Sequence, residues 1–196
     1  MLVPTLRPRL SRAEVEEIAA RELIKFDLSR ERFPCVMLGI RGYYKNSMGV
    51  SGQNDRGIYD DALFICTPNA FLSVNANCDA SKYRKGWGFG REKGMASLAK
   101  GVWMYQPGIH RTYAAFRQAA AVLVNRDGTK GDYSEVGWFG INIHKGGTFG
   151  TSSLGCQTIP PSQWASFKEL MYGQLKMFGQ KTFPYILIDE SEIKLG

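Results

Sequence analysis

Apolar residues along this chain fall in short runs separated by turn-forming residues. Such runs occur at residues 33–40, 62–66, 71–76 and 183–188, and each has the length and composition of a β-strand. Many of the 22 glycines lie between runs, as in the polar stretch 49–57, which we expect to be a loop. The pattern therefore predicts a mainly β fold.

Two other segments carry apolar residues at helical spacing. Ser11 begins a capping-box pattern with Glu14, and Ser162, after two prolines, can cap a helix near the end of the chain. The apolar stripes that follow are Val15, Ile18, Ala19 and Leu23 in the first helix and Trp164, Phe167, Met171 and Leu175 in the second. We interpret both stripes as core packing, so a few peripheral helices accompany the sheet and the class is α+β overall.

The length of the chain bounds its domain organisation. A chain of 196 residues that is 44% hydrophobic can bury one sizeable core. We expect residues 1–50 to form an N-terminal helix and strand extension, and residues 51–196 to form the main domain that carries the candidate site. The two parts are predicted to make one compact unit.

The net charge of +7 indicates an acidic partner, and nucleic acid, an anionic membrane and an anionic cell wall all qualify. Lys and Arg are scattered, with modest concentrations at residues 7–9 and 82–91, so we expect no nucleic-acid partner. No run approaches the roughly 20 apolar residues that span a bilayer, which argues against stable membrane insertion. The first residues lack the apolar core of a secretory signal, so we expect synthesis as a soluble cytoplasmic protein.

The four cysteines form no C-x-x-C pair and are accompanied by only two histidines, so no zinc-binding spacing is present. We predict neither a metal nor a cofactor. Cys35 and Cys66 lie inside apolar runs and are expected to be small buried hydrophobic side chains.

Residues 141–156 carry the most information about function. His144 follows a short apolar run, and Cys156 comes twelve positions later, after a Gly- and Ser-rich loop. An imidazole that takes the proton of a thiol makes it a strong nucleophile, so we predict Cys156 as nucleophile and His144 as base. Gly155 permits close approach of a substrate, and the N–H groups of Gly155 and Cys156 are candidate oxyanion donors. Ser153 can hydrogen-bond either the loop or the substrate.

This arrangement resembles the catalytic core of the L,D-transpeptidase family (YkuD-like domains). In that family an apolar strand ending in His-Gly precedes a glycine-containing loop and the motif Ser-His-Gly-Cys. Here the motif is Ser153-Leu154-Gly155-Cys156, and Gln157-Thr158 stands where the family has an aliphatic residue and an arginine. A looser likeness extends over residues 58–190, including the segment 94–105.

The resemblance implies an L,D-transpeptidase-like β-sandwich that acts on peptidoglycan stem peptides through a thioester. The product is either a hydrolysed peptide, from L,D-carboxypeptidase or endopeptidase activity, or a transpeptidase crosslink, and we favour hydrolysis. Such an enzyme would act in the periplasm or cell wall after release or delivery, as phage lysis enzymes and effectors do. In the family a backbone carbonyl commonly orients the histidine.

Several further residues are candidates for binding the substrate. They are Lys145, Gly146, Gln157 and His110, with Lys145, Gln157 or Arg126 as replacements for the missing motif arginine. His110 either lines the cleft or is an exposed turn histidine.

Three alternatives remain open. A non-catalytic cell-wall-binding or virion structural protein would keep the fold but have an unreactive Cys156. A sortase-like transpeptidase also places His before Cys, but usually with a longer interval and a later arginine. A glycosidase needs two convergent carboxylates, whereas Asp60 and Asp61, adjacent on a strand, would point to opposite faces.

Overall fold

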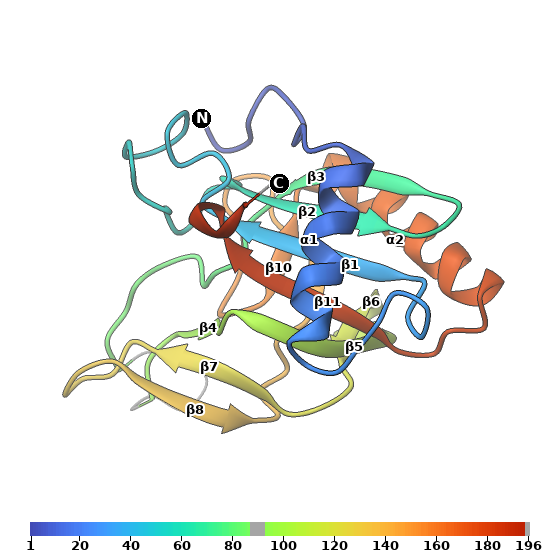
Figure 1. Cartoon of the computed structure of the whole chain (residues 1–196). Coiled ribbons are helices and arrows are strands. Elements are labelled where there is room, and N and C mark those ends of the chain that lie inside the picture. Colours follow the sequence, from blue (N-terminus) through green and yellow to red (C-terminus); the bar gives the residue numbers. More distant parts are fainter. Residues whose placement is uncertain (87–92, 195–196) are drawn as a thin grey trace.

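The computed structural model describes residues 1–86 and 93–194 (Figure 1). Residues 87–92, which include the end of the basic stretch 82–91, lie outside the described residues, as do residues 195 and 196.

Within that part of the chain, two α-helices, one short 3₁₀ helix and eleven strands form. The helices are α1 (Arg12–Ile24), α2 (Pro161–Met177) and η1 (Glu190–Glu192). The strands are β1 (Val36–Arg41), β2 (Asp61–Cys66), β3 (Phe71–Ala76), β4 (Ala96–Leu98), β5 (Gly101–His110), β6 (Tyr113–Gln118), β7 (Val122–Arg126), β8 (Tyr133–Gly137), β9 (Ile143–Lys145), β10 (Gln157–Ile159) and β11 (Phe183–Asp189). The predicted mainly β, α+β class is confirmed.

The strands form two sheets. Eight of them lie in the order β10-β9-β6-β5-β11-β1-β2-β3, and β4, β7 and β8 form a three-stranded sheet at one side (Figure 1). The two edge strands of the large sheet, β3 and β10, approach each other. Asn77, just after β3, forms an isolated antiparallel β-bridge with Thr158 of β10. The large sheet is therefore nearly closed, and β1, from the N-terminal extension, lies in its middle between β11 and β2.

Each face of the large sheet packs against one helix. Successive side chains of a strand point to opposite faces, so Val36, Leu38 and Ile40 pack with the α1 stripe while Met37 packs with the α2 stripe. In Figure 1, α1 crosses the strands on one side and α2 lies on the other. Burial on both faces explains why β1 and β2 are continuous apolar runs rather than alternating ones.

The helix termini confirm one prediction and correct another. Ser11 and Glu14 form the predicted capping box. The second helix begins at Pro161, with Pro160 at the N-cap, so Ser162 lies inside the first turn and is not the cap. Proline suits the first helical position because its fixed φ matches the helix and its missing N–H would have had no partner there.

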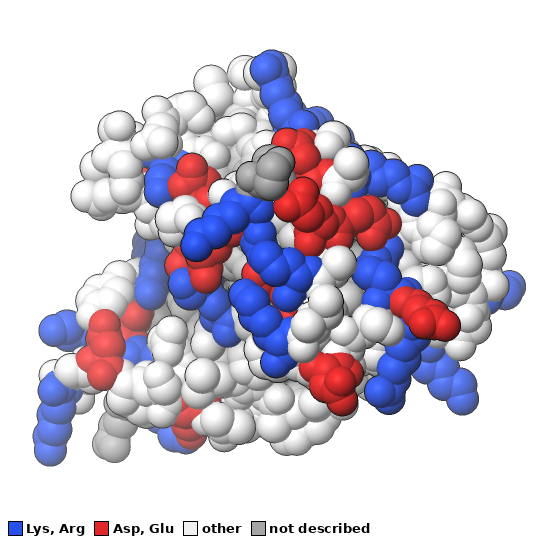
Figure 2. All heavy atoms as spheres, viewed as in Figure 1, with Lys and Arg blue, Asp and Glu red and all other residues white. Residues whose placement is uncertain are grey.

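None of the helices in residues 1–86 and 93–194 is long and apolar enough to cross a bilayer. On the face that carries α1, basic and acidic side chains are interspersed, with no single-sign surface (Figure 2).

Candidate functional site

Parallel pairing of β9 with β10 brings His144 and Cys156 together. Gln157 pairs with Ile143 and Thr158 pairs with His144. Cys156, one residue before β10, therefore lies beside Asn142, one residue before β9. The eleven residues between His144 and Cys156 thus return the thiol to the side of the imidazole.

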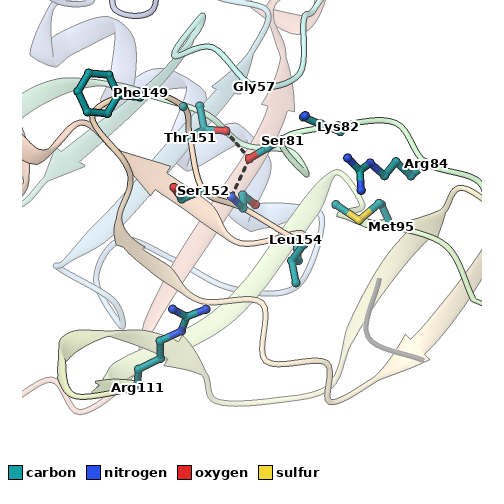
Figure 3. Close-up of a pocket in the computed structure, with 12 residues that line it drawn as sticks. Gly57, Ser81, Lys82, Arg84, Met95, Arg111, Phe149, Thr151, Ser152 and Leu154 are labelled. Atoms are coloured by element: carbon teal, nitrogen blue, oxygen red, sulfur yellow. Dashed lines mark hydrogen bonds between the residues drawn. The ribbon is translucent and has the colours of Figure 1, made fainter. Parts of the chain in front are cut away.

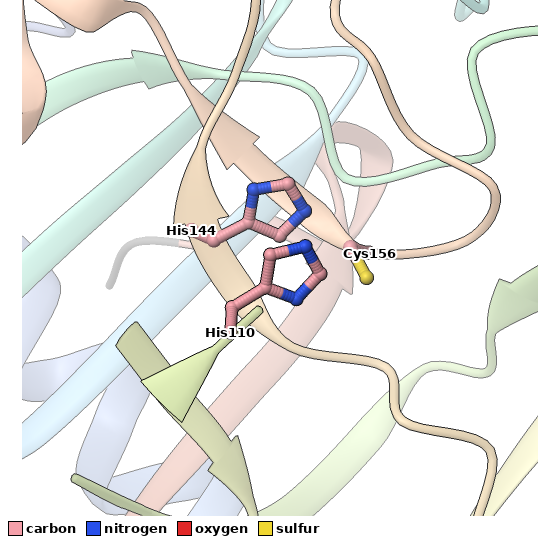
Figure 4. A group of neighbouring side chains, drawn as sticks. All are labelled: His110, His144 and Cys156. Carbon is pink, nitrogen blue, oxygen red and sulfur yellow. The ribbon is translucent and has the colours of Figure 1, made fainter. Parts of the chain in front are cut away.

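The two predicted catalytic side chains share their cleft with His110. One ring nitrogen of each histidine and the Cys156 Sγ all lie within 4.8 Å of one another. Figure 4 shows the two imidazoles lying one over the other with the thiol beside them. The ring centroids are 3.9 Å apart and the planes are inclined by 8°. Cys156 and His110 are half-buried, whereas His144 is buried.

His110 is not an exposed turn histidine. It is the last residue of β5, and the hairpin that follows it pairs His110 with Tyr113. Its Nδ1 lies 2.9 Å from the Asn142 side-chain amide nitrogen, which donates to it. His110 therefore lines the cleft, which was the other possibility left open by the sequence.

Hydrogen bonds fix the orientation of the His144 ring. Its Nδ1–H donates to the Lys145 carbonyl at 2.7 Å, and the Tyr113 hydroxyl oxygen lies 3.0 Å from the same nitrogen. In this tautomer the proton is on Nδ1 and Nε2 carries a lone pair, which a general base needs in order to accept a proton. A backbone carbonyl thus orients the histidine, in agreement with the expectation from L,D-transpeptidases.

Burial keeps both reactive groups uncharged in the free protein. It lowers the pKa of His144 to about 4, and the neighbouring charges of His110 and Arg111 act in the same direction. Burial also raises the pKa of the Cys156 thiol to about 11, although the Asn142 N–H and the Arg111 charge oppose the shift. The resting pair is a neutral thiol and a neutral imidazole, so a role as nucleophile would require the thiol to lose its proton.

In this conformation the thiol contacts backbone groups and not the imidazole. Its Sγ accepts from the Asn142 N–H at 3.4 Å and donates to the Gly140 carbonyl at 3.5 Å. Hydrogen bonds between catalytic groups are often long in a free enzyme and tighten when substrate binds. The nearest imidazole nitrogens lie within 4.8 Å of Sγ.

The turn before the nucleophile differs from the predicted oxyanion arrangement. The Gly155 N–H donates to Ser153 Oγ at 2.9 Å, and that hydroxyl donates to the Cys156 carbonyl at 2.6 Å. Ser153 is buried and holds the turn, and the Gly155 amide is already occupied. The Cys156 N–H is left as the remaining candidate donor from this turn.

The loop 146–156 is held in place from two sides. The Ser81 hydroxyl lies 2.6 Å from the Thr151 hydroxyl and accepts from the Ser153 N–H at 2.7 Å (Figure 3). On the other side the Tyr59 hydroxyl donates to the Gly147 carbonyl at 2.7 Å. Such support keeps a reactive group in one position.

Two predicted substrate-binding residues face away from the cleft. The buried side chain of Gln157 accepts from the Tyr185 hydroxyl at 3.0 Å in the core. Gly146 is buried against the Tyr59 hydroxyl, which a Cβ would overlap. Neither residue lines either cleft, so the geometry does not support these two assignments. Gln157 faces the core because alternation turns the neighbour of Cys156 toward the opposite face, whereas Gly146 lies just after β9 and is covered by Tyr59.

Of the three residues proposed to replace the motif arginine, Gln157 lies in the core, and the two basic ones are not free in the cleft either. Lys145 is exposed, with its Nζ 5.5 Å from the centre of the Tyr113 ring, outside the residues that line the cleft. Arg126 does line the cleft, but its Nε lies 2.6 Å from a Glu135 oxygen. Its charge is therefore already paired.

Arg111 is the cation that sequence reasoning missed. It occupies the turn between β5 and β6 and lines both the cleft of about 310 Å³ that holds Cys156 and an adjoining cleft of about 560 Å³. Figure 3 shows Arg111, Lys82 and Arg84 around this second cleft. Among the described residues, no hydrogen bond or ion pair engages the exposed Arg111 guanidinium. The sequence held no signal for this position, because only the hairpin brings it over the cleft.

The remaining candidate groups do not form a second catalytic centre. Asp61 accepts from the backbone N–H groups of Gly42 and Cys78, whereas Asp60 accepts from that of Asp55. The carboxylates thus serve different backbone donors, although burial raises the pKa of Asp61, and Asp60, which lies just before β2, is close enough to raise that pKa further. The free cysteines Cys35, Cys66 and Cys78 are buried, which confirms the interpretation of Cys35 and Cys66 as core side chains.

Comparisons of the chain with family models, curated proteins and solved structures give no match in any of the three. The resemblance to L,D-transpeptidases therefore rests on the sequence motif alone.

Proposed function

We propose that the protein is a cysteine-dependent acyl-transfer enzyme that acts on peptidoglycan stem peptides through a thioester. The observation that carries the proposal is the convergence of Cys156 with His144, whose Nδ1–H is held by the Lys145 carbonyl. A carbonyl-oriented imidazole with a free Nε2 beside a half-buried thiol has the parts of a nucleophile and base pair.

The first half of the reaction forms the thioester. Cys156 Sγ attacks the carbonyl carbon of the residue that precedes a D-amino acid, while His144 Nε2 takes the thiol proton. The oxyanion of the tetrahedral intermediate accepts a hydrogen bond from the Cys156 N–H. The C–N bond then breaks, and His144 returns the proton to the leaving amine, so the imidazole is neutral again.

The second half determines which enzyme class applies. Water attacks the thioester carbonyl, His144 takes a proton from it, and the C–S bond breaks to restore the thiol and release a carboxylic acid. An amine attacking in the same way would give a crosslink. We favour hydrolysis, because the thioester would lie beside the exposed Leu154 and Arg111, where water has access.

The cations of the adjoining cleft suit an anionic substrate. Stem peptides carry carboxylates, and Arg111 has a planar guanidinium that binds a carboxylate through two parallel hydrogen bonds. Arg111 borders both clefts, so a carboxylate near the scissile bond can reach it while the carbonyl lies at Cys156. The apolar side chains of Leu154 and Met95 line the second cleft and can contact the peptide stem.

The test is incubation of the protein and its Cys156→Ala variant with murein and isolated tetrapeptide muropeptides, followed by mass spectrometry. The proposal is supported if the parent removes a terminal D-alanine, cuts a crosslink or exchanges a D-amino acid, and the variant does none of these. The product also identifies the acceptor. Cys35→Ala is the matched control, because it removes a buried thiol far from the cleft and should retain activity.

If the parent leaves every species unchanged, the enzymatic proposal fails for this substrate. Binding of murein by the parent and by Cys156→Ala with equal affinity would then favour the non-catalytic wall-binding or virion structural alternative.

A further inference from the structure

Three potential metal ligands meet in the cleft from three separate segments of the chain. His110 ends β5, His144 lies in β9 and Cys156 precedes β10, yet their donor atoms lie within 4.8 Å of one another. No other cluster of three such residues forms among the described residues. The sequence predicted that His144 and Cys156 lie together, but it gave no metal-binding spacing, because His110 comes from a separate hairpin.

The surroundings of both imidazoles suit coordination through Nε2. Histidines that bind a metal usually donate their other ring N–H to a carbonyl or carboxylate, which fixes the tautomer. His144 already does so through Nδ1–H and the Lys145 carbonyl. Its Nε2 is thus available as a ligand.

Asn142 supplies the corresponding group for His110. Its side chain is 7% exposed, and its Oδ1 is buried without a hydrogen-bond partner among the described residues. Its amide nitrogen lies 2.9 Å from His110 Nδ1. Rotation of the amide by half a turn exchanges the two atoms, so Oδ1 then accepts from a protonated Nδ1 and the His110 Nε2 is freed.

We infer that His110, His144 and Cys156 form a site for a thiophilic divalent cation such as Zn²⁺, with two imidazole nitrogens and one thiolate as ligands. Zinc takes such donors with three protein ligands and leaves a fourth position open. Here the fourth position faces the cleft of about 310 Å³. Binding converts the thiol to a metal thiolate and releases one proton to solvent.

The geometry requires small side-chain movements. Zn–N bonds of about 2.0–2.1 Å and a Zn–S bond of about 2.3 Å place tetrahedral ligands roughly 3.3–3.7 Å apart. The donor atoms, within 4.8 Å of one another, must therefore close by up to about 1.5 Å, and the parallel rings must tilt toward a common point. The half-buried His110 and Cys156 can rotate, whereas the buried His144 is held by its carbonyl.

The bound cation would block the Cys156 thiolate, which is the nucleophile of the proposed acyl transfer. If the proposed acyl transfer is correct, zinc binding therefore inhibits it reversibly, and the metal-free protein is the active form. This regulatory consequence rests on the proposed function, but the metal site does not.

The experiment is calorimetric titration of chelator-treated protein with Zn²⁺ in two buffers of different ionisation enthalpy. We expect one Zn²⁺ per chain and release of about one proton. Cys156→Ala and His110→Phe, which keeps a flat ring over His144, should each weaken zinc binding by at least about 100-fold. Loss of a group that only hydrogen-bonds a metal ligand already weakens metal binding by about 10–100-fold, and each of these variants loses a ligand itself. Cys35→Ala, which removes a thiol outside the cleft, should bind as the parent does. Circular dichroism shows whether each variant is folded.

Absence of binding by the parent, or equal binding by a folded Cys156→Ala variant, would overturn the site. The outcome is separable from that of the proposed function. Zinc binding by a protein that leaves muropeptides intact would uphold the site alone, whereas turnover by a protein that binds no zinc would uphold the enzyme alone.

Discussion

The imidazole rings of His110 and His144 stack face to face, with centroids 3.9 Å apart. Two charged rings at this distance would repel each other strongly, so protonation of one opposes protonation of the other. Stacking and burial together favour the neutral state of His144, which is the state that can accept a proton from Cys156.

The two histidines allow this relationship to be measured directly by NMR titration, because the chain contains no others. We expect the pKa of His144 at about 4 and that of His110 below its ordinary 6.5. Replacement of His110 by Phe keeps the burial but removes its charge, so the pKa of His144 should rise toward 6.5 without reaching it. A pKa near 6.5 for His144 in the parent protein would contradict the described packing.

The reactivity of Cys156 should increase steeply with pH. Its thiol has a pKa of about 11, so it is protonated at neutral pH and only the small thiolate fraction reacts. Alkylation by iodoacetamide should accelerate about tenfold per pH unit between pH 7 and 10. Mass spectrometry of peptides identifies the modified residue, and the buried Cys35, Cys66 and Cys78 serve as internal references. A rate that is already maximal at pH 7 would indicate a preformed thiolate.

Arg111 adopts a φ of 55°, a conformation that costs a non-glycine residue about 1–2 kcal/mol. Arg111→Gly removes this strain but adds about 0.5–1 kcal/mol of unfolded-state entropy. We therefore expect unchanged or slightly higher stability in urea. If Arg111 binds a substrate carboxylate, kcat/KM on muropeptides should fall about 10- to 100-fold. Arg117→Ala, which removes another exposed arginine of the same sheet, should leave kcat/KM unchanged, and an equal loss in both variants would indicate a general charge effect.

Gly155 sets the position of Cys156 through its backbone. Its φ is 147°, and a Cβ would lie 2.5 Å from the Ala96 carbonyl oxygen and 2.8 Å from Ile141 Cδ1. Gly155→Ala should therefore lower the free energy of unfolding by roughly 2–4 kcal/mol. Gly150→Ala in the same loop meets no atom within 4 Å and should change it by less than about 0.5 kcal/mol. Urea denaturation compares the two, and equal effects would contradict this account.

Asp60 should make stability depend on pH. Burial raises its pKa from 3.8 to about 7, and its Oδ1 has no hydrogen-bond partner among the described residues. Because the folded pKa exceeds the unfolded one, the stability contributed by the protonated carboxyl is complete below pH 3.8 and is lost as pH rises to 7. The Asn side chain stays neutral at every pH. The free energy of unfolding of Asp60→Asn should therefore exceed that of the parent by an amount that grows to roughly 2–4 kcal/mol by pH 8. The exposed Asp27→Asn is the control for urea denaturation at each pH, and an advantage independent of pH would contradict the shift.

The sequence by itself determined the elements whose patterns are local. The capping box of α1, the buried runs of β1, β2, β3 and β11 and the two helical stripes follow from spacing and burial along consecutive residues. The sequence also predicted that His144 and Cys156 lie close together, but not the parallel pairing of β9 with β10 that achieves this.

The tertiary structure alone decided which other side chains meet this pair. Gln157 follows Cys156 along the chain but faces the core, because each step along a strand reverses the side. Gly146 lies close to His144 in sequence, but the Tyr59 hydroxyl covers it. Conversely, His110 and Arg111 reach the cleft from a hairpin about 30 residues upstream, and Asn142 joins them through its side chain. Such contacts depend on how β5, β6 and β9 are ordered in the sheet. No local pattern encodes that order, since it results from burying all the apolar faces at once.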